Sequence, residues 1–279
     1  MIRLLTGSVK RVWALLSAVL LIVALLADAS PGEPEGARLV GSNTYMLEQA
    51  LIRGQGLTTD GEHLYFSGNY FLNKTDAATG QTVKTNLLAI PPALLLKGCN
   101  HIGGISYHNG LIYAAVEDGP DYNHPYIVLY DAETLRFTGN YYRLPQELHI
   151  KGVPWCAVDA DAGVIYTAEW SNAQKLNVFA LEEMRLLRTV PLSQPLDRIQ
   201  DAEMYTGTLY LSADDANKTV YALDPATGQV RTAFVRHVSP GAEVEGMTIM
   251  STTEGPLFYV ADIGTLRINL TVRQYRLEG

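Results

Sequence analysis

The sequence is poor in cysteine and in clustered positive charge. Only two cysteines, Cys99 and Cys156, occur among 279 residues, which excludes a small fold held together by disulfides. The formal net charge is −8, and no block of Lys or Arg follows residue 11. Because a nucleic-acid surface needs clustered cations to displace counterions, we exclude nucleic acid as a partner.

The sequence also lacks the linear motifs that identify common catalytic sites. It contains no G-x-S-x-G, no phosphate-binding P-loop and no H-E-x-x-H, which carry nucleophilic, nucleotide and zinc chemistry respectively. Any functional site must therefore be assembled from residues that lie far apart in the chain.

The N-terminus has the three-part order of a targeting segment. The parts are the cations Arg3, Lys10 and Arg11, the apolar run Val12–Leu26, and the small-residue motif Ala27-Asp28-Ala29. The run is short for a bilayer span, so residues 1–29 are predicted to be a signal peptide and the protein to be secreted. An uncleaved anchor that leaves the rest outside the membrane is the alternative. Membrane contact is expected only through this segment, and residues 30–37, rich in Pro and Gly, are predicted to be a linker.

Five short stretches of similar form recur along the remaining chain. Each centres on a small residue: Gly56, Gly104, Ala157, Ala202 and Gly246. Each is followed by a turn or polar loop and a run rich in Tyr, Phe or Val. Repeats of this length with several short strands predict an all-β fold, a five-bladed β-propeller over residues 38–279. Small residues are expected where the innermost strands converge on the axis.

The fifth repeat ends one strand short of a full blade. The stretch Arg38–Met46 precedes the first repeat and is predicted to supply the missing outer strand, which closes the ring. When the five repeats are aligned with one another, Cys156 falls at the position of Gly103, which is four residues beyond Cys99. That offset is too long for a disulfide at about 3.3 Å per residue, so we predict two separate thiols.

Polar and aromatic side chains gather on the predicted inner strands, and we predict that they line the mouth of the axial channel. These ligand-binding candidates are Arg53, Gln55, His101, Trp155, Asp201, Glu203, Glu243 and Glu245. Because alternate strand residues share a face, Glu243 should project with Glu245, and Asp201 with Glu203. In the alternative interpretation these groups only solvate the channel and pair with Arg53 or Arg198.

The carboxylates of this set also suit a hard cation. Calcium is the one cofactor we consider, held by Glu245 with Asp201 and Glu243. An acid/base pair of carboxyl groups with separated pKa values is the other chemical interpretation.

Short motifs on the inner strands resemble the plant-type and bacterial glutaminyl cyclotransferases. Gln55-Gly56-Leu57 looks like that family's opening Q-G-L strand, and residues 199–203 look like its L-N-E-L-E strand. The resemblance implies a five-bladed propeller and a role for Gln55 at the mouth. This chain has Gly103 where the family has its acid/base glutamate, and Trp155 stands one place before the family's tryptophan.

The sequence therefore favours an exported propeller that binds a small molecule or peptide at the axial mouth, as a binding or scaffold protein. The alternative is an enzyme at the same mouth. It would be either cyclotransferase-like or a cation-dependent lactonase or hydrolase. The second option follows from a similar resemblance to senescence-marker/gluconolactonase proteins, which hold a divalent cation through inner-strand Glu, Asn and Asp. In this chain Glu245 and Asp201 suit that role.

Overall fold

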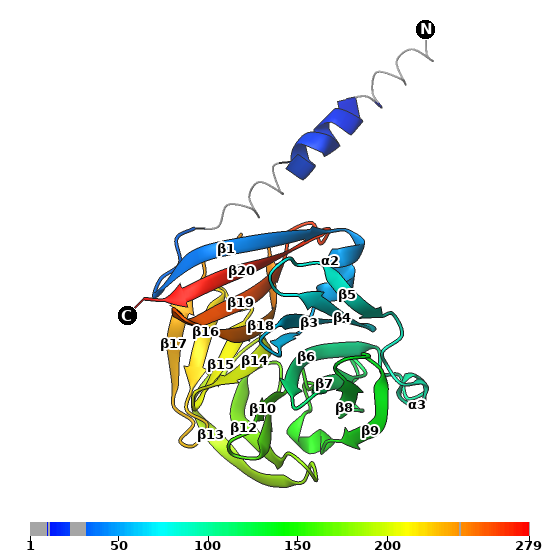
Figure 1. The fold of residues 1–279 in the computed structure, drawn as a ribbon, viewed down its shortest axis with the longest axis vertical. Helices are drawn as coiled ribbons and strands as arrows, with labels where there is room; N and C mark the ends of the chain where they lie inside the picture. The colour runs from blue at the N-terminus through cyan, green and yellow to red at the C-terminus, as the bar shows by residue number, and fades with distance from the viewer. Residues whose placement is uncertain (1–9, 11, 23–31, 240, 279) are drawn as a thin grey trace.

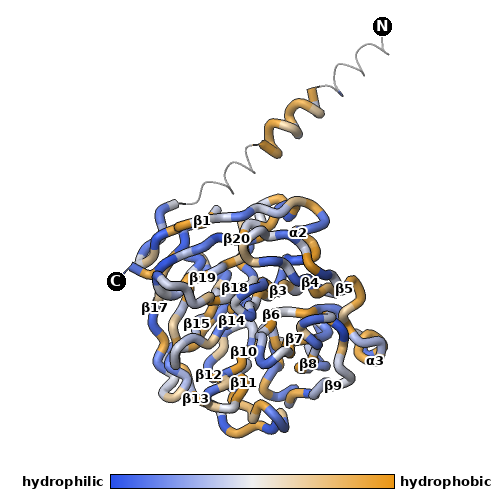
Figure 2. Tube along the Cα trace, viewed as in Figure 1, coloured by the Kyte–Doolittle hydropathy of each residue, from blue (hydrophilic) through white to orange (hydrophobic). Residues whose placement is uncertain are grey.

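The computed structural model describes residue 10 and residues 12–22, 32–239 and 241–278. Residues 12–22 are helical and exposed, and Figure 2 shows this helix as largely hydrophobic. No helix among the described residues is long and apolar enough to cross a membrane. The predicted cleavage motif, like most of the predicted signal peptide, lies outside the described residues.

Five four-stranded antiparallel sheets surround a central axis (Figure 1). This arrangement confirms the predicted all-β, five-bladed propeller. Within each of the first four blades the strands follow in chain order from the axis outward. The two free cysteines, Cys99 and Cys156, confirm the prediction of separate thiols.

The first four blades consist of consecutive strands. Blade 1 contains β2 (Leu57–Thr59), β3 (His63–Gly68), β4 (Phe71–Asp76) and β5 (Thr82–Asn86). Blade 2 contains β6 (His101–His108), β7 (Leu111–Glu117), β8 (Tyr126–Asp131) and β9 (Phe137–Arg143). Blade 3 contains β10 (Ala157–Asp159), β11 (Val164–Thr167), β12 (Ala173–Ala180) and β13 (Leu186–Leu196). Blade 4 contains β14 (Ile199–Tyr205), β15 (Thr208–Ala213), β16 (Thr219–Leu223) and β17 (Val230–Val235).

Within the propeller, the short helices of the described residues lie in the connections between blades. They are α2 (Glu48–Arg53), α3 (Pro92–Leu95) and the 3₁₀ turn η1 (Gln146–Leu148). Each of them leads from an outer strand toward the inner strand of the next blade, so these connections lie at the same end of the channel.

Blade 5 combines the two ends of the domain. Its inner strands are β18 (Glu243–Thr252), β19 (Gly255–Ile263) and β20 (Asn269–Leu277). Its outermost strand is β1 (Ala37–Met46), which pairs antiparallel with β20. The closing strand proposed from the sequence thus lies in this blade and begins one residue earlier than predicted.

Residues 32–36, which belong to the predicted linker, are hydrogen-bonded to blade 4. The Gly32 N–H donates to the carbonyl of His237 at 2.8 Å, and Glu35 exchanges two 2.9 Å backbone hydrogen bonds with Val235. These hydrogen bonds join backbone groups, so a Pro- and Gly-rich composition does not prevent them. The side chains also meet, with His237 Nε2 2.8 Å from Glu35 Oε1. Gly32 and Glu35 are therefore held against the outer edge of blade 4.

Small residues at the axis have the role expected from the repeat. A Cβ atom added to Gly56 would lie 2.6 Å from the Cα of Gly104, and one added to Gly246 would lie 2.6 Å from the carbonyl oxygen of Gln55. Separations this short are incompatible with a side chain in a close-packed interior. The inner strands of blades 1, 2 and 5 therefore approach so closely because glycine occupies these positions.

Candidate functional site

A pocket of about 480 Å³ opens at the mouth of the channel where the blade-to-blade connections lie. All five blades or the segments leading into them contribute to its wall through Gln55, His101, Pro154, Gln200 and Glu245. This size falls in the range typical of small-molecule sites.

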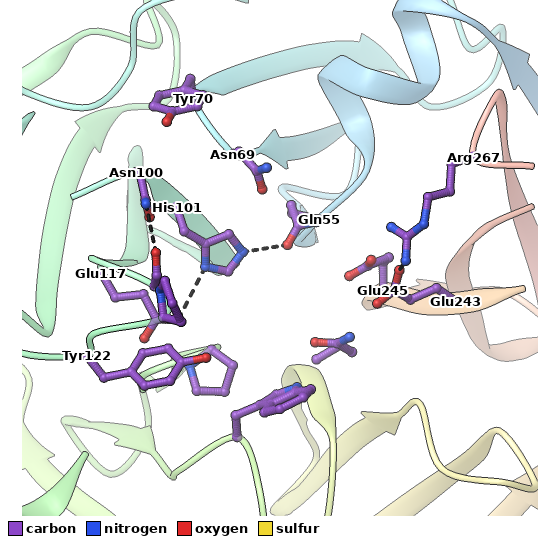
Figure 3. A pocket seen from close by; sticks show the side chains of 15 residues that line it. Gln55, Asn69, Tyr70, Asn100, His101, Glu117, Tyr122, Glu243, Glu245 and Arg267 are labelled. Atoms are coloured by element: carbon purple, nitrogen blue, oxygen red, sulfur yellow. Dashed lines mark hydrogen bonds and ion pairs between the residues drawn. The ribbon is translucent and has the colours of Figure 1, made fainter. Parts of the chain in front are cut away.

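Four predicted site residues line this axial pocket: Gln55, His101, Glu243 and Glu245 (Figure 3). They come from the start of an inner strand or the residues just before it, where each strand begins at the mouth. The shared position of these residues in the repeat was thus sufficient to predict that they line one pocket.

His101 is held by groups on both ring nitrogens. Its Nε2 lies 2.6 Å from Oε1 of Gln55, and its Nδ1 lies 3.4 Å from Oε1 of Glu117. Glu117 stands directly opposite His101 on the neighbouring strand β7, and its other oxygen accepts the Val153 N–H. The imidazole is therefore fixed in orientation by one neighbouring blade and by its own blade.

Glu243 and Glu245 share the face of β18 that meets the pocket, but their environments differ. Glu243 forms an ion pair with Arg267, an exposed residue of the β19–β20 loop. Glu245 is only 4% exposed. Burial raises its pKa well above the usual range, and the negative charges of Glu243 and Asp214 raise it further, while Arg267 opposes them. The environment thus favours the neutral carboxylic acid at Glu245.

Asp201 lies deep on the axis and does not line the pocket. Its Oδ2 accepts the N–H of Leu57 at 2.8 Å and the N–H of Met247 at 3.1 Å. Burial raises the pKa of Asp201 well above normal, although these backbone donors oppose the shift. Asp201 therefore joins the inner strands of blades 1, 4 and 5 to one another.

Glu203 lies at the opposite mouth of the channel. It lines a second pocket of about 510 Å³ together with Tyr107 and Asp161. Its Oε2 accepts hydrogen bonds from Thr248 at 2.8 Å and Thr58 at 3.3 Å. Alternation places Asp201 and Glu203 on one face as predicted. The strand runs along the axis, however, so residues on one face lie at successive depths and not in one site.

Two predicted residues, Arg53 and Trp155, are buried and do not line the pocket. Arg53 in α2 is 1% exposed, donates to Asn73 Oδ1 at 2.9 Å and has its guanidinium 4.1 Å from the centre of the Tyr45 ring. Trp155 is also 1% exposed and packs in the apolar core shared by blades 3 and 4. Both positions were inferred from sequence proximity to an inner strand, which does not specify where a side chain points.

The structure does not gather the three carboxylates considered for calcium. Glu243 is paired with Arg267, and both oxygens of Asp201 accept backbone N–H groups. Among the described residues no group of three or more His, Cys, Asp or Glu is arranged to hold a metal ion. Calcium binding stays a prediction, which a melting curve with calcium and with a chelator tests.

Four pocket residues come from loops or strand ends that the repeat pattern did not single out: Glu117, Tyr122, Trp170 and Arg267. In the sequence, the acidic and aromatic character of residues 117–124 was the signal that could have identified Glu117 and Tyr122. Trp170 lies beside Arg198, whose guanidinium is 5.5 Å from the centre of the indole. Loop residues of this kind complete the wall between the inner strands.

We expect Glu203→Gln to stabilise the domain at pH 8 and not at pH 4.5. Burial raises the pKa of Glu203 from 4.5 to about 7, so the folded state binds the proton more tightly than the unfolded state. Stability is then highest below the unfolded pKa and falls as the pH rises to about 7. Because Glu203 is only partly buried, we expect an effect of about 2 kcal/mol, or roughly 4–8 °C. An equal difference between the two proteins at both pH values contradicts this.

One comparison with known proteins agrees with the repeat architecture. A family model described as "Repeat of unknown function (DUF6923)" matches residues 100–248, more than half of the chain. No curated protein matches. Among solved structures, one similar chain is Kuenenia stuttgartiensis hydrazine synthase, with 14% sequence identity and a TM-score of 0.45. The alignment covers 74% of this chain and 55% of that one.

Proposed function

Since the chain belongs to the family described as "Repeat of unknown function (DUF6923)", whose description states no activity, we propose from the pocket that its axial mouth binds a small molecule or short peptide. The observation that carries this proposal is the convergence of all five blades on one pocket of about 480 Å³. Sites of this size with a few convergent polar groups are where ligands usually bind.

The wall combines aromatic surface with hydrogen-bonding groups. Tyr70 is 40% exposed, and Tyr122 and Trp170 also contribute to the wall. The amide side chains of Gln55 and Gln200 stand among them. Rings supply contact area at a low entropic cost, and amides both donate and accept, so the site is suited to orient a polar ligand.

We expect Trp170→Ala to weaken binding about tenfold, which corresponds to about 1.4 kcal/mol. The full chain is screened by its melting temperature against sugars, polyols, amines, amino acids and peptides with N-terminal glutamine, and the best binder is titrated. Asp161→Asn, in the second pocket at the other mouth, is the matched control. Equal affinity of Trp170→Ala and the unaltered protein for that ligand contradicts binding at the axial mouth.

An enzyme at the same mouth is the second candidate. Two observations favour it: the neutral form of Glu245 can act as a general acid, and His101 stands in a fixed orientation between Gln55 and Glu117. Turnover of N-terminal-glutamine peptides or small lactones, lost in Glu245→Gln, would replace the binding-only proposal. The cyclotransferase option has Gly103 where an acid/base glutamate is required, so we favour binding.

Export belongs to the same proposal. It is supported by the order of cations, apolar run and small-residue motif in residues 1–29. The propeller then works outside the membrane, released or held by the N-terminal segment. Sequencing the N-terminus of the natural protein distinguishes cleavage after Ala29 from an intact anchor.

A further inference from the structure

The charged side chains that line the axial pocket are largely paired with one another. Glu243 forms an ion pair with Arg267, and Glu117 faces His101 while also accepting the Val153 N–H. Figure 3 shows both pairs on the wall of the pocket. A charged ligand would have to compete with these internal partners.

Glu245 is the remaining carboxyl group of the wall. The described groups that act on it are the carboxyl groups of Glu243, Asp214 and Asp201 and the guanidinium of Arg267. Burial, first of all, and these three carboxyl groups raise its pKa, while Arg267 lowers it. In the neutral form this carboxyl both donates and accepts a hydrogen bond, as a hydroxyl-bearing ligand requires.

Several polar groups of the wall are uncommitted. Among the described residues, no hydrogen-bond partner is found for the side chains of Asn69, Gln200 and Tyr122. The Nε2 of Gln55 is also open, since only its Oε1 contacts His101. These groups are neutral and offer both donors and acceptors. The exposed ring of Tyr70 stands at the edge of the same pocket.

We propose that the axial pocket takes a neutral polyhydroxyl ligand, namely a sugar or a cyclic polyol. This inference rests on the proposed function and names the class of ligand. Hydroxyl groups match the open amides and the Glu245 carboxyl, and the apolar face of a sugar ring matches an aromatic wall. A neutral ligand also leaves the Glu243–Arg267 and His101–Glu117 pairs intact, whereas an ionic ligand adds a charge that must be desolvated.

The class of ligand is tested by calorimetric titration of the full chain with four sets of probes. The neutral set contains glucose, galactose, arabinose, myo-inositol and β-linked disaccharides. The three charged sets contain the cations choline and spermidine, the anion citrate, and zwitterionic glutamine. Calcium chloride is titrated separately. We expect binding in the neutral set, with an affinity that changes less than twofold between 50 and 500 mM NaCl, because a neutral ligand is insensitive to screening.

The position of the binding site is tested by Gln200→Leu, which removes an amide without a hydrogen-bond partner and keeps a side chain of similar size. We expect it to lower affinity for the neutral ligand at least tenfold, while Asp161→Asn in the opposite pocket leaves it unchanged. Binding of a charged probe alone, with loss of affinity at high salt, overturns the polyol class and leaves the proposed function standing. Binding that Gln200→Leu and Trp170→Ala both leave unchanged, or no binding by any probe, contradicts the proposed function itself.

Discussion

A chain that starts at Leu47 is expected to lose the cooperative melt of the whole domain. Removing β1 leaves the edge of β20 without its antiparallel partner and takes away the Tyr45 ring that lies against the buried guanidinium of Arg53. It also separates the two ends of the ring, because β1 is the N-terminal strand in a sheet otherwise built from the C-terminus. We expect destabilisation of at least 5 kcal/mol, or a fall of roughly 10–20 °C in melting temperature.

The matched control is a chain that starts at Ala37, which retains all of β1. A third chain that starts at Gly32 keeps the backbone pairing of residues 32–36 with blade 4 and measures that contribution separately. Scanning calorimetry of the three proteins provides the comparison. Melting of the Leu47 chain within 2 °C of the Ala37 chain contradicts closure by β1.

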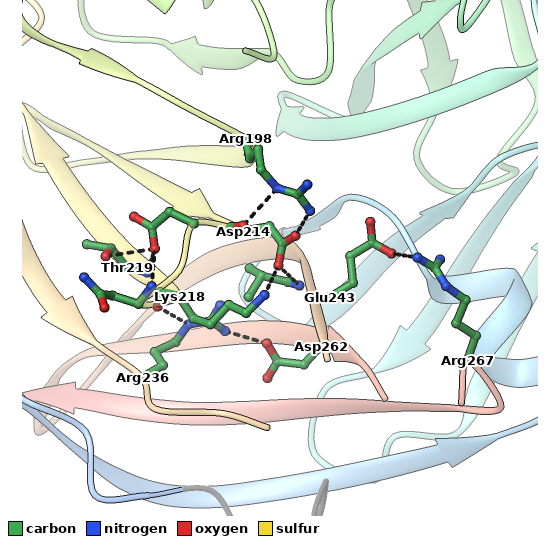
Figure 4. Close-up of polar contacts among 11 residues, drawn as sticks. Arg198, Asp214, Lys218, Thr219, Arg236, Glu243, Asp262 and Arg267 are labelled. Carbon is green, nitrogen blue, oxygen red and sulfur yellow. Dashed lines mark hydrogen bonds and ion pairs between the residues drawn. The ribbon is translucent and has the colours of Figure 1, made fainter. Parts of the chain in front are cut away.

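Asp262→Asn should destabilise the domain by about 3–5 kcal/mol, the usual effect of removing one partner from a buried ion pair. Asp262 accepts a hydrogen bond from Arg236 at 2.8 Å (Figure 4). Its other oxygen accepts one from Arg273 at 2.6 Å. All three side chains are at most 3% exposed. The substitution leaves two buried guanidinium groups without their shared carboxylate, so the melting temperature should fall by roughly 6–20 °C.

Glu254→Gln is the control for this second prediction. It removes the carboxylate that pairs with Arg276 in blade 5, but Glu254 is 76% exposed, and exposed pairs contribute less than about 1 kcal/mol. Thermal melts of both variants at pH 7 and constant salt compare the buried and the exposed pair. If Asp262→Asn costs no more than Glu254→Gln, the buried ion pair between Arg236, directly after blade 4, and Asp262 of blade 5 does not stabilise the domain.

The fold could be predicted from the sequence because its strongest constraint is periodic. Inner strands approach so closely that a side chain on Gly56 would meet the backbone of Gly104, so small residues must recur once per blade. The closing strand could be predicted, to within one residue, for a similar reason. A fifth repeat that lacks one strand needs a partner for its outer edge. The pairing of residues 32–36 carries no such signal, because it consists mainly of backbone hydrogen bonds.

The site could be predicted only in part. Gln55, His101, Glu243 and Glu245 lie at strand starts, where the repeat places them at the mouth. Asp201 shows the limit of that argument. The alternation of side chains along a strand predicts which face a residue occupies, but not how deep in the channel it lies. Trp170 and Arg267 lie in loops whose conformations depend on neighbouring blades, so no pattern in the sequence gives their direction.

The most direct measurement of the central claim is a crystal structure of the protein soaked with the compound that binds most tightly in the titrations. The account predicts that compound in the axial pocket, with its hydroxyl groups on Gln200 and Glu245 and its ring against Trp170 or Tyr122. The Glu243–Arg267 pair should remain closed. A compound bound at the opposite mouth beside Glu203, or on the outer surface of a blade, would contradict the account.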